Sequence, residues 1–493
     1  MPARGNQMET RLLIGGKQVP GEGEPLAVEN PATEETVAEL KVASTEQVDA
    51  AIATAREASR GWANTPALER GEMLHEVATR LRARQEEIAR VMTLEGGKPL
   101  VENTDEIDWT AAAFDFYAEI GRNFAGRVIP PIESTQLAMV LKEPMGVVGA
   151  IVPWNYPLLL LSWKLAPALA AGNTVVAKPS EITPLSTLML ASCFDHLPPG
   201  TLALLAGAGD VGGRIVADER VDCVAFTGSV DTGKKIAAKC AERVARINLE
   251  MGGKDPFIVC ADVADQIDIA ARGGAWAAYL NAGQVCTSAE RFYVQREVYD
   301  DFVSAFVEHT RTLVVGDPMD AQTDMGPMVS APQRAKVQAQ VEAAVAAGAE
   351  LVLGGDRAGQ SVGHFYSPAV ITGAPADTDL LREETFGPVA PIVPVSSLDE
   401  AIELANGTRF GLGANVYTRD LATAVRCMRE IRAGTVWIND PLTDNDAGPF
   451  GGFKQSGLGR ELGQEGLEAF QETKHVHMET KIEAKEWWYP YGG

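Results

Sequence analysis

Apolar positions near the N-terminus recur at the spacing of a helix. Val48, Ile52 and Ala55 are three or four residues apart, and the same spacing returns in residues 73–81, with arginine and glutamate between. This spacing places the apolar side chains on one face. It predicts amphipathic helix over residues 44–92.

Further along, short apolar runs alternate with longer helical stretches. Runs typical of buried strands occupy residues 147–152, 173–178, 201–205, 222–227, 256–260 and 291–295, and helices are expected over 267–279 and 331–348. Apolar strands that alternate with helices indicate parallel sheets covered on both faces. We therefore predict an α/β fold with two domains, joined near residues 250–254.

Residues 128–143 have a different pattern. Two prolines are followed by alternation through Leu137, Met139 and Leu141. Such alternation is typical of a half-exposed strand. We expect a ribbon that leaves the body, and the alternating residues 475–481 are the candidate partner strand.

Composition narrows the class of protein. The 493 residues are 46% hydrophobic and 22% charged, as in soluble globular chains of two or three domains. A formal charge of −24 disfavours nucleic acid and anionic membranes as partners. Six scattered cysteines and six histidines support neither a disulfide framework nor a metal site. No bilayer-spanning run or signal sequence is visible, so we expect a cytoplasmic protein.

Cys286 is the candidate nucleophile. It ends the segment Asn-Ala-Gly-Gln-Val-Cys at residues 281–286, among small and amide residues, and Glu250 with Gly252 and Gly253 is a candidate base upstream. A thiolate can attack a carbonyl carbon. A lone cysteine is as often a small buried hydrophobe. Other segments must therefore decide between the two interpretations.

Two glycine motifs resemble phosphate-binding loops. Gly207–Gly212 matches G-x-G-x-x-G, but only Asp231, in a turn, stands where a ribose-binding acid should end a second strand, which disfavours a dinucleotide fingerprint. Gly228–Lys235 is one residue short of a P-loop, because Lys235 replaces the hydroxyl that would hold magnesium. The start of a helix after residues 227–229 still offers backbone N–H groups to a phosphate. It predicts a pyrophosphate cradle without metal chemistry.

Several further segments combine glycine, proline, aromatic and charged residues at strand ends or in loops. The full set of motifs is Pro153–Pro157, Lys178–Glu181, Phe226–Ser229, Glu250–Lys254, Gly283–Cys286, Glu384–Pro388 and Pro449–Gly457. Together these motifs are highly specific. From residue 10 to residue 478, approximately, the chain resembles the aldehyde dehydrogenase superfamily. The resemblance implies oxidation of an aldehyde to a carboxylic acid with NAD(P).

The resemblance also implies a domain organisation. A Rossmann-like NAD-binding domain would comprise residues 1–125 and 145–252, and an α/β catalytic domain residues 253–448. Residues 126–144 and 449–493 would form a small β oligomerisation ribbon and the C-terminal tail. A homo-oligomer, either a dimer or a tetramer, is therefore expected.

Roles for the catalytic residues follow from the same resemblance. Cys286 would attack the aldehyde to give a thiohemiacetal and then a thioester. Asn155 would donate its amide, with the backbone N–H of Cys286, to the developing oxyanion. Glu250 would activate the water that hydrolyses the thioester. Burial alone raises the pKa of a thiol, so we expect nearby charge or dipoles to activate Cys286.

Cofactor contacts are also implied. Lys178 and Glu181 would bind the adenosine ribose, Ser229 would meet the pyrophosphate, and Glu384 would bind the nicotinamide ribose with Phe386 nearby. The remaining expected contacts are Trp154, Ser180, Gly228 and Gly252. The Glu181 carboxylate would repel a 2′-phosphate, which favours NAD over NADP.

Substrate choice is left open between two classes. Tyr156 and Trp163 match two walls of the aromatic box that holds an ammonium group in betaine-aldehyde and aminoaldehyde oxidisers. Leu280 and Asp444 fall near the other walls and are not aromatic. Asp444 could attract a cation or be a solvated turn residue. The expected pocket further includes Val285, Thr287 and Phe450. A broad range of aliphatic or aromatic aldehydes is predicted, with betaine aldehyde or an aminoaldehyde as the alternative.

Three other functions are disfavoured by the sequence. A catalytically silent structural or binding member of the fold is disfavoured by the joint presence of Cys286, Glu250, Asn155 and Lys178. Transfer of the acyl group to CoA is disfavoured by Glu250, which suits hydrolysis. Oxidation of a phosphorylated aldehyde lacks a basic cluster to support it.

The C-terminal tail departs from the family pattern. Residues 487–491 contain four aromatic side chains in five positions. Disordered tails are rarely so aromatic. We expect residues 483–493 to pack either on a neighbouring subunit, bordering its substrate tunnel, or on their own subunit.

Overall fold

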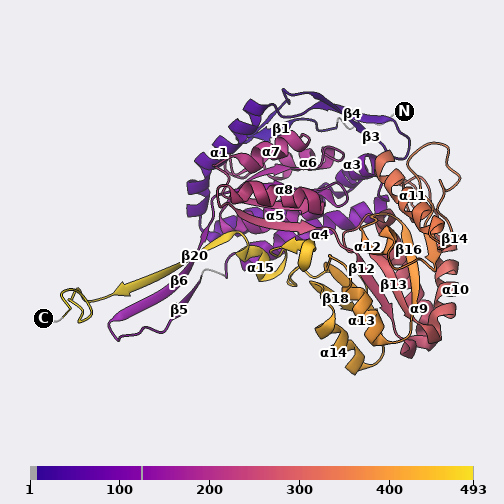
Figure 1. The fold of residues 1–493 in the computed structure, drawn as a ribbon. Helices are drawn as coiled ribbons and strands as arrows, with labels where there is room; N and C mark the ends of the chain where they lie inside the picture. Colours follow the sequence, from indigo (N-terminus) through magenta and orange to yellow (C-terminus); the bar gives the residue numbers. More distant parts are fainter. Residues whose placement is uncertain (1–7, 124–125, 492–493) are drawn as a thin grey trace.

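A computed structural model describes residues 8–123 and 126–491 of the chain. Residues 1–7, 124–125 and 492–493, at the edges of the expected domain ranges and tail, lie outside the described residues. Figure 1 shows two α/β bodies side by side and a ribbon that projects away from them. The predicted α/β class is confirmed.

The first body is built on an eight-stranded sheet in the order β19-β11-β10-β7-β8-β9-β1-β2. Its strands are β1 (Leu12–Ile14), β2 (Lys17–Val19), β7 (Val147–Ile151), β8 (Thr174–Lys178), β9 (Leu202–Leu204), β10 (Cys223–Gly228), β11 (Arg246–Met251) and β19 (Gly457–Leu458). The five central strands, from β11 to β9, are parallel. Every residue of β7 and β8 is buried, as their continuous apolar sequences predict.

Helices cover both faces of this sheet (Figure 1). They are α1 (Thr45–Asn64), α2 (Ala67–Ala83), α3 (Gln85–Gly96), α4 (Leu100–Ile120), α5 (Pro157–Ala171), α6 (Leu185–Met189), α7 (Gly209–Ala217), α8 (Val230–Ala241) and α15 (Gly463–Glu468). The predicted helix over residues 44–92 is therefore three helices. Pro66 lies between the first two and cannot donate the backbone hydrogen bond that would continue α1.

The second body has a seven-stranded sheet in the order β14-β15-β16-β13-β12-β17-β18. Its strands are β12 (Asp255–Val259), β13 (Ala289–Gln295), β14 (Glu350–Leu353), β15 (Ala369–Thr372), β16 (Val389–Val395), β17 (Gly413–Tyr417) and β18 (Thr435–Ile438). The principal helices are α9 (Ile267–Tyr279), α10 (Arg296–Thr312), α11 (Ala331–Ala346), α12 (Asp379–Arg382), α13 (Leu398–Asn406) and α14 (Leu421–Glu430). All pairings except β14 with β15 are parallel. The helices predicted over 267–279 and 331–348 correspond to α9 and α11.

The projecting ribbon is a three-stranded sheet in the order β20-β6-β5. It consists of β5 (Gly126–Ile129), β6 (Gln136–Pro144) and β20 (Gln471–Glu479). The last strand pairs antiparallel with β6 along its whole length, with His475 opposite Val140. The predicted pairing of the two alternating segments is confirmed. A separate hairpin joins β3 (Pro25–Glu29) to β4 (Thr36–Lys41).

The C-terminal region is divided between the first body and the ribbon. Gly457–Leu458 pairs with β11, and α15 contacts α5, before the chain enters the ribbon. The described tail then lies at the ribbon's far end (Figure 1). There Lys485 forms ion pairs with Glu133 and Glu479. The expected domain bounds stay a prediction.

No helix within residues 8–123 and 126–491 is both long and apolar enough to cross a bilayer.

Candidate active site

The carboxyl ends of the central strands of the first sheet border a cavity of about 650 Å³, here called the sheet-edge cavity. Because β7, β8 and β10 are parallel, the loops that follow them open at the same edge. The cavity contains six of the expected cofactor residues, namely Trp154, Lys178, Ser180, Glu181, Gly228 and Ser229. The sequence motifs at the strand ends therefore share one site.

Charge in the sheet-edge cavity comes from Lys178, Glu181 and the start of α8. Lys178 is buried, its Nζ lies 3.4 Å from Glu181 Oε2, and burial lowers the pKa of its ammonium group. Ser229 is the N-cap of α8, where its hydroxyl accepts a hydrogen bond from the backbone N–H of Thr232. Lys235 also lines the cavity. A helix N-terminus beside a lysine suits a phosphate group.

The G-x-G-x-x-G segment also reaches this cavity. Gly209 and Gly212, at the start of α7, are among its lining residues. The carboxylate in the same cavity is Glu181, which follows β8 and does not lie downstream of the glycines. The segment therefore borders the site, while the acid expected of a dinucleotide fingerprint comes from another loop.

A second cavity, the junction cavity, has a volume of about 200 Å³. It shares Trp154, Gly228 and Ser229 with the sheet-edge cavity, so the two are continuous. Its other principal lining residues are Asn155, Met251, Gly252, Cys286, Gln333, Lys336, Glu384 and Phe386. Here loops from the two bodies meet.

Within the junction cavity, aromatic and acidic groups from the second body face the first. The rings of Trp154 and Phe386 meet edge to face, with centroids 5.4 Å apart. A Cβ atom at Gly252 would overlap the Glu384 carboxylate, so only glycine leaves this approach open. Burial, followed by repulsion from Glu290, raises the pKa of Glu384 to about 7.

The third cavity, the apolar cavity, has a volume of about 450 Å³. It holds all seven residues of the expected substrate pocket, namely Tyr156, Trp163, Leu280, Val285, Thr287, Asp444 and Phe450. Trp109 and Trp276 add two aromatic side chains that sequence reasoning missed, and each is 46% exposed. Both lie within helices, where an aromatic residue looks like ordinary core or surface.

Acidic residues mark one side of the apolar cavity. Although solvent reaches Asp444, the surrounding walls displace much of its water, and this desolvation together with repulsion from Asp446 raises its pKa to about 7. Burial also raises the pKa of Asp446. The described lining of this cavity contains neither lysine nor arginine. Its electrostatics therefore disfavour anionic ligands.

Cys286 lines both the apolar cavity and the junction cavity. Burial raises the pKa of its thiol well above the usual range, and the carboxylates of Asp255, Asp444 and Glu384 raise it further. The charges of this chain that act on Cys286 thus favour the neutral thiol. The activation expected from nearby charge is not found among the ionised side chains described here.

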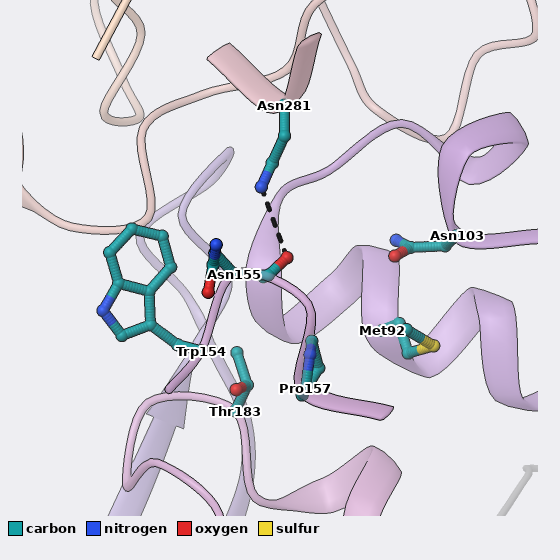
Figure 2. A pocket seen from close by; sticks show the side chains of 8 residues that line it. Met92, Asn103, Trp154, Asn155, Pro157, Thr183 and Asn281 are labelled. Atoms are coloured by element: carbon teal, nitrogen blue, oxygen red, sulfur yellow. Dashed lines mark hydrogen bonds between the residues drawn. The ribbon is translucent and has the colours of Figure 1, made fainter. Parts of the chain in front are cut away.

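Asn155 lies beside the nucleophile loop and is 4% exposed. Its Nδ2 donates a hydrogen bond of 3.0 Å to the backbone carbonyl of Gln284, two residues before Cys286. Its own backbone carbonyl accepts hydrogen bonds from Asn281 Nδ2, drawn in Figure 2, and from Lys98 Nζ, both at 3.3 Å. Because an amide has two N–H groups, Asn155 can hold the loop and still donate into the junction cavity.

Glu250 is placed differently from the other two expected catalytic residues. It lies on β11, is 2% exposed, and does not line any of the three cavities. Neither carboxylate oxygen has a hydrogen-bond partner in the described structure, and a Cβ atom at Gly451 would lie 2.7 Å from Oε1. Burial and repulsion from Glu461 raise the pKa of Glu250 well above the usual range, while Lys164 opposes that shift.

Within the described ranges, no group of three or more histidine, cysteine, aspartate and glutamate side chains is arranged to hold a metal ion.

Known proteins resemble this chain along almost its whole length. A sequence model of the Aldehyde dehydrogenase family matches residues 19–476. A betaine aldehyde dehydrogenase of Bacillus subtilis is 39% identical over 97% of this chain and 99% of its own. A mitochondrial succinate-semialdehyde dehydrogenase of Oryza sativa is 38% identical, over 96% of this chain and 90% of its own.

Solved structures agree with these sequence relatives. A crystal structure of betaine aldehyde dehydrogenase from Staphylococcus aureus, in complex with NAD+, matches with a TM-score of 0.95 and 36% identity. The match covers 98% of this chain and 97% of that one. Motifs, fold and relatives therefore agree, and the chain belongs to the aldehyde dehydrogenase family.

Proposed function

We propose that this protein oxidises an aldehyde to a carboxylic acid with NAD, using Cys286 as the nucleophile. The observation that carries the proposal is the place of Cys286 between two cavities. The apolar cavity gives an aldehyde access to the thiol from one side. The junction cavity, continuous with the sheet-edge cavity, gives a dinucleotide access from the other.

The residues around the continuous cavities fit NAD. Glu181 and Lys178 would hold the adenosine ribose, Ser229 and the start of α8 the pyrophosphate, and Glu384 the second ribose. Gly252 leaves the space that a larger residue would fill. When bound, oxidised NAD accepts a hydride and brings a positive ring charge. The Staphylococcus relative crystallised with NAD+ supports this choice, and the Glu181 carboxylate favours NAD over NADP.

The proposed chemistry begins at Cys286. Its sulfur bonds to the aldehyde carbon, the carbonyl oxygen becomes an oxyanion, and the thiol proton passes to solvent water. The second N–H of Asn155 donates to that oxyanion, with the backbone N–H of Cys286. Loss of hydride from the same carbon leaves a thioester on Cys286.

Hydrolysis of the thioester would use Glu250. In the structure its carboxylate faces the Gly451 loop, so this step requires the side chain to turn toward the junction cavity. Because its pKa is raised, the carboxylate is more basic than an exposed glutamate and better able to take a proton from water. The water oxygen then bonds to the acyl carbon, and the bond to Cys286 breaks.

The substrate class we favour is an uncharged aliphatic or aromatic aldehyde. Trp109, Trp163 and Phe450 are among five aromatic residues of the apolar cavity, whose volume admits more than a two-carbon chain. The lack of lysine or arginine in its described lining argues against dicarboxylate semialdehydes, although one relative bears such a name.

A cationic aldehyde is the second candidate because of Asp444 and Asp446. Neither carboxylate has an ion-pair partner among the described residues, and both border a cavity rich in aromatic rings. Cations bind to aromatic faces and carboxylates alike. Relatives named betaine aldehyde dehydrogenase and aminoaldehyde dehydrogenase support this alternative.

The deciding experiment measures kcat/KM for hexanal, benzaldehyde, betaine aldehyde, 4-aminobutanal and succinic semialdehyde by NADH formation. We expect the uncharged aldehydes to lead and succinic semialdehyde to be poorest. Cys286→Ala should abolish NADH formation, and equal activity of that variant would exclude the mechanism. A requirement for CoA would reassign the second step to acyl transfer.

Assembly and location complete the proposal. The ribbon of β5, β6 and β20 projects from the bodies and offers strand edges to another subunit (Figure 1). We therefore propose that the protein is a homo-oligomer, either a dimer or a tetramer. Its proposed location is the cytoplasm. Light scattering of the purified protein would establish the number of subunits.

A further inference from the structure

We propose that Asn281 is a positioning residue that fixes the oxyanion donor Asn155 against the nucleophile loop. The inference rests on the proposed function, because it requires Asn155 to stabilise the oxyanion. Asn281 itself does not line the apolar or the junction cavity. It therefore acts through Asn155 and not by touching the substrate.

Asn281, Asn155 and Gln284 form a closed hydrogen-bonded ring. Asn281 Nδ2 donates to the backbone carbonyls of Asn155 and Gln284, each at 3.3 Å. The Gln284 carbonyl also accepts from Asn155 Nδ2 at 3.0 Å. Both the backbone and the side chain of Asn155 are thereby tied to the loop that carries Cys286.

Figure 2 shows how this contact is made. The Asn281 side chain points from its loop to the carbonyl of Asn155, and both residues line a small void together with Asn103 and Met92. That void has a volume of only about 10 Å³, which is too small for an organic ligand. Asn281 is 3% exposed. Its amide is therefore committed to the two carbonyls.

The backbone at Asn281 is held in a costly conformation. Asn281 and Ala282 have φ angles of 49° and 55°, in the left-handed region, where asparagine is tolerated better than most residues. The backbone N–H of Asn281 donates to Glu102 of α4, at 3.1 Å to Oε2. Glu102 thus anchors the strained turn through the backbone, independently of the side-chain contact with Asn155. Such strain persists only where neighbouring contacts fix it.

These contacts have a catalytic consequence. One N–H of Asn155 is held by the Gln284 carbonyl, so the direction of the second depends on where that carbonyl and the Asn155 backbone lie. Asn281 fixes both. Without it, Asn155 can rotate or shift, and the oxyanion loses a well-placed donor. Asn281 forms no hydrogen bond to the Cys286 thiol among the described residues, so we expect a reaction of the thiol that needs no oxyanion to be affected far less.

The test uses Asn281→Gly, because glycine adopts the positive φ without strain while the variant loses the side chain that carries the amide. We expect kcat to fall about 10-fold or more, approaching the loss of about 10²–10³ for a missing oxyanion donor. KM should change far less. Alkylation of Cys286 by iodoacetamide, which develops no oxyanion, should keep its wild-type rate.

A double-variant cycle shows whether Asn281 acts through Asn155. If it does, Asn155→Ala combined with Asn281→Gly has the kcat of Asn155→Ala alone, because residues that act as a unit are not additive. Additive losses, or an unchanged kcat in Asn281→Gly, overturn the inference. An unchanged kcat in Asn155→Ala overturns the proposed oxyanion role instead.

Two further variants separate positioning from general stability. Asn173 is also buried, and its Nδ2 donates to the backbone carbonyls of Ala168 and Phe470; it precedes β8, at the end of that strand opposite Lys178 and the cavities. Asn173→Ala should lower Tm while kcat stays at the wild-type value. Glu102 anchors the backbone of Asn281. Glu102→Gln keeps an acceptor oxygen and should keep the wild-type kcat, whereas kcat should fall in Glu102→Ala. Equal kcat losses in Asn173→Ala and Asn281→Gly would reduce Asn281 to a structural residue.

Discussion

The Glu384 carboxylate lies directly against Gly252, so that a methyl group on Gly252 would overlap it. The two residues come from different bodies and meet in the junction cavity. We predict that Gly252→Ala displaces Glu384 and weakens NAD binding about 10-fold or more, as misplaced contacts can cost up to about 10². Titration of the cofactor against protein fluorescence measures this directly.

Gly348 is the matched control for Gly252. It ends the turn after α11, and a Cβ atom there would meet nothing within 4 Å, although its φ of 107° favours glycine. Gly348→Ala should reduce Tm through backbone strain and leave NAD affinity unchanged. Equal NAD affinities for Gly252→Ala and wild type would remove Glu384 from the ribose site.

Strand ends were the most predictable part of the site. Asn155 lies in the loop that follows one apolar run and Lys178 ends the next, and parallel strands bring such positions to one edge of a sheet. The ribbon was predictable because both of its long strands alternate, and a period of two identifies a half-exposed strand. These signals are local, so a single sequence contains them.

Other features depend on contacts that no local pattern records. Trp109 and Trp276 lie within α4 and α9 and become cavity walls only when the two bodies meet. The orientation of Glu250 depends on β19, whose strand partner is about 200 residues away in the sequence. The break between α1 and α2 was signalled by Pro66, but the break between α2 and α3 falls at Arg84, where the sequence carries neither proline nor glycine.

Glu250→Gln should lower kcat because amide oxygen is a poor base. A loss of about 10²–10⁴ is expected for a general base. In wild type, the rate of thioester hydrolysis should increase with pH as the carboxyl of Glu250, whose pKa is raised, loses its proton. The variant should lack that rise. Single-turnover kinetics with a burst of NADH separate hydride transfer from hydrolysis, and a variant that retains the pH-dependent rise would contradict the assignment.

The same variant should affect stability in the opposite direction. A carboxyl with a raised pKa in the folded state holds its proton more tightly than in the unfolded state. The free energy of unfolding therefore decreases as pH rises above the unfolded pKa. In that range the unfolded state is stabilised by ionisation of the carboxyl, whereas burial opposes the same ionisation in the folded state. Glu250→Gln removes this penalty, so its Tm should exceed that of wild type increasingly from pH 5 toward pH 8. A wild type more stable than the variant across this range would show that Glu250 is stabilised as an anion.

Glu181 should determine the choice between NAD and NADP. Its carboxylate is half-buried in the sheet-edge cavity and lies 3.4 Å from Lys178. In Glu181→Gln the repulsion of a 2′-phosphate disappears and Lys178 is free to attract it. We expect the preference for NAD, measured as the ratio of kcat/KM values, to fall about 10-fold, which corresponds to about 1.4 kcal/mol. An unchanged ratio would place the selectivity elsewhere.

The aromatic tail should contribute to assembly. Four aromatic side chains at the end of the ribbon are each more than half exposed, namely Trp487, Trp488, Tyr489 and Tyr491. Clustered exposed apolar side chains are typical of a surface that binds another protein. Deletion of residues 483–493 should weaken subunit association in sedimentation experiments and lower Tm. If the tail also borders a neighbour's tunnel, KM for the aldehyde increases. Unchanged assembly, Tm and KM would leave the tail without either role.

Asp444 should discriminate between cationic and uncharged aldehydes. Asp444→Asn removes a charge at the apolar cavity while keeping the side chain's size. We expect kcat/KM for 4-aminobutanal to fall about fivefold, because a solvent-accessible ion pair contributes up to about 1 kcal/mol. The value for hexanal should not change.

The pH dependence sharpens this prediction. Because the pKa of Asp444 is about 7, its carboxylate is mostly protonated at pH 6 and mostly ionised at pH 8. In wild type, the ratio of kcat/KM for 4-aminobutanal to that for hexanal should therefore rise between these values, and the common steps at Cys286 and Glu250 cancel in the ratio. In Asp444→Asn this ratio should be the same at pH 6 and pH 8. A ratio that rises equally in both proteins would assign the effect to another acid, for which Asp446→Asn is the next variant to measure.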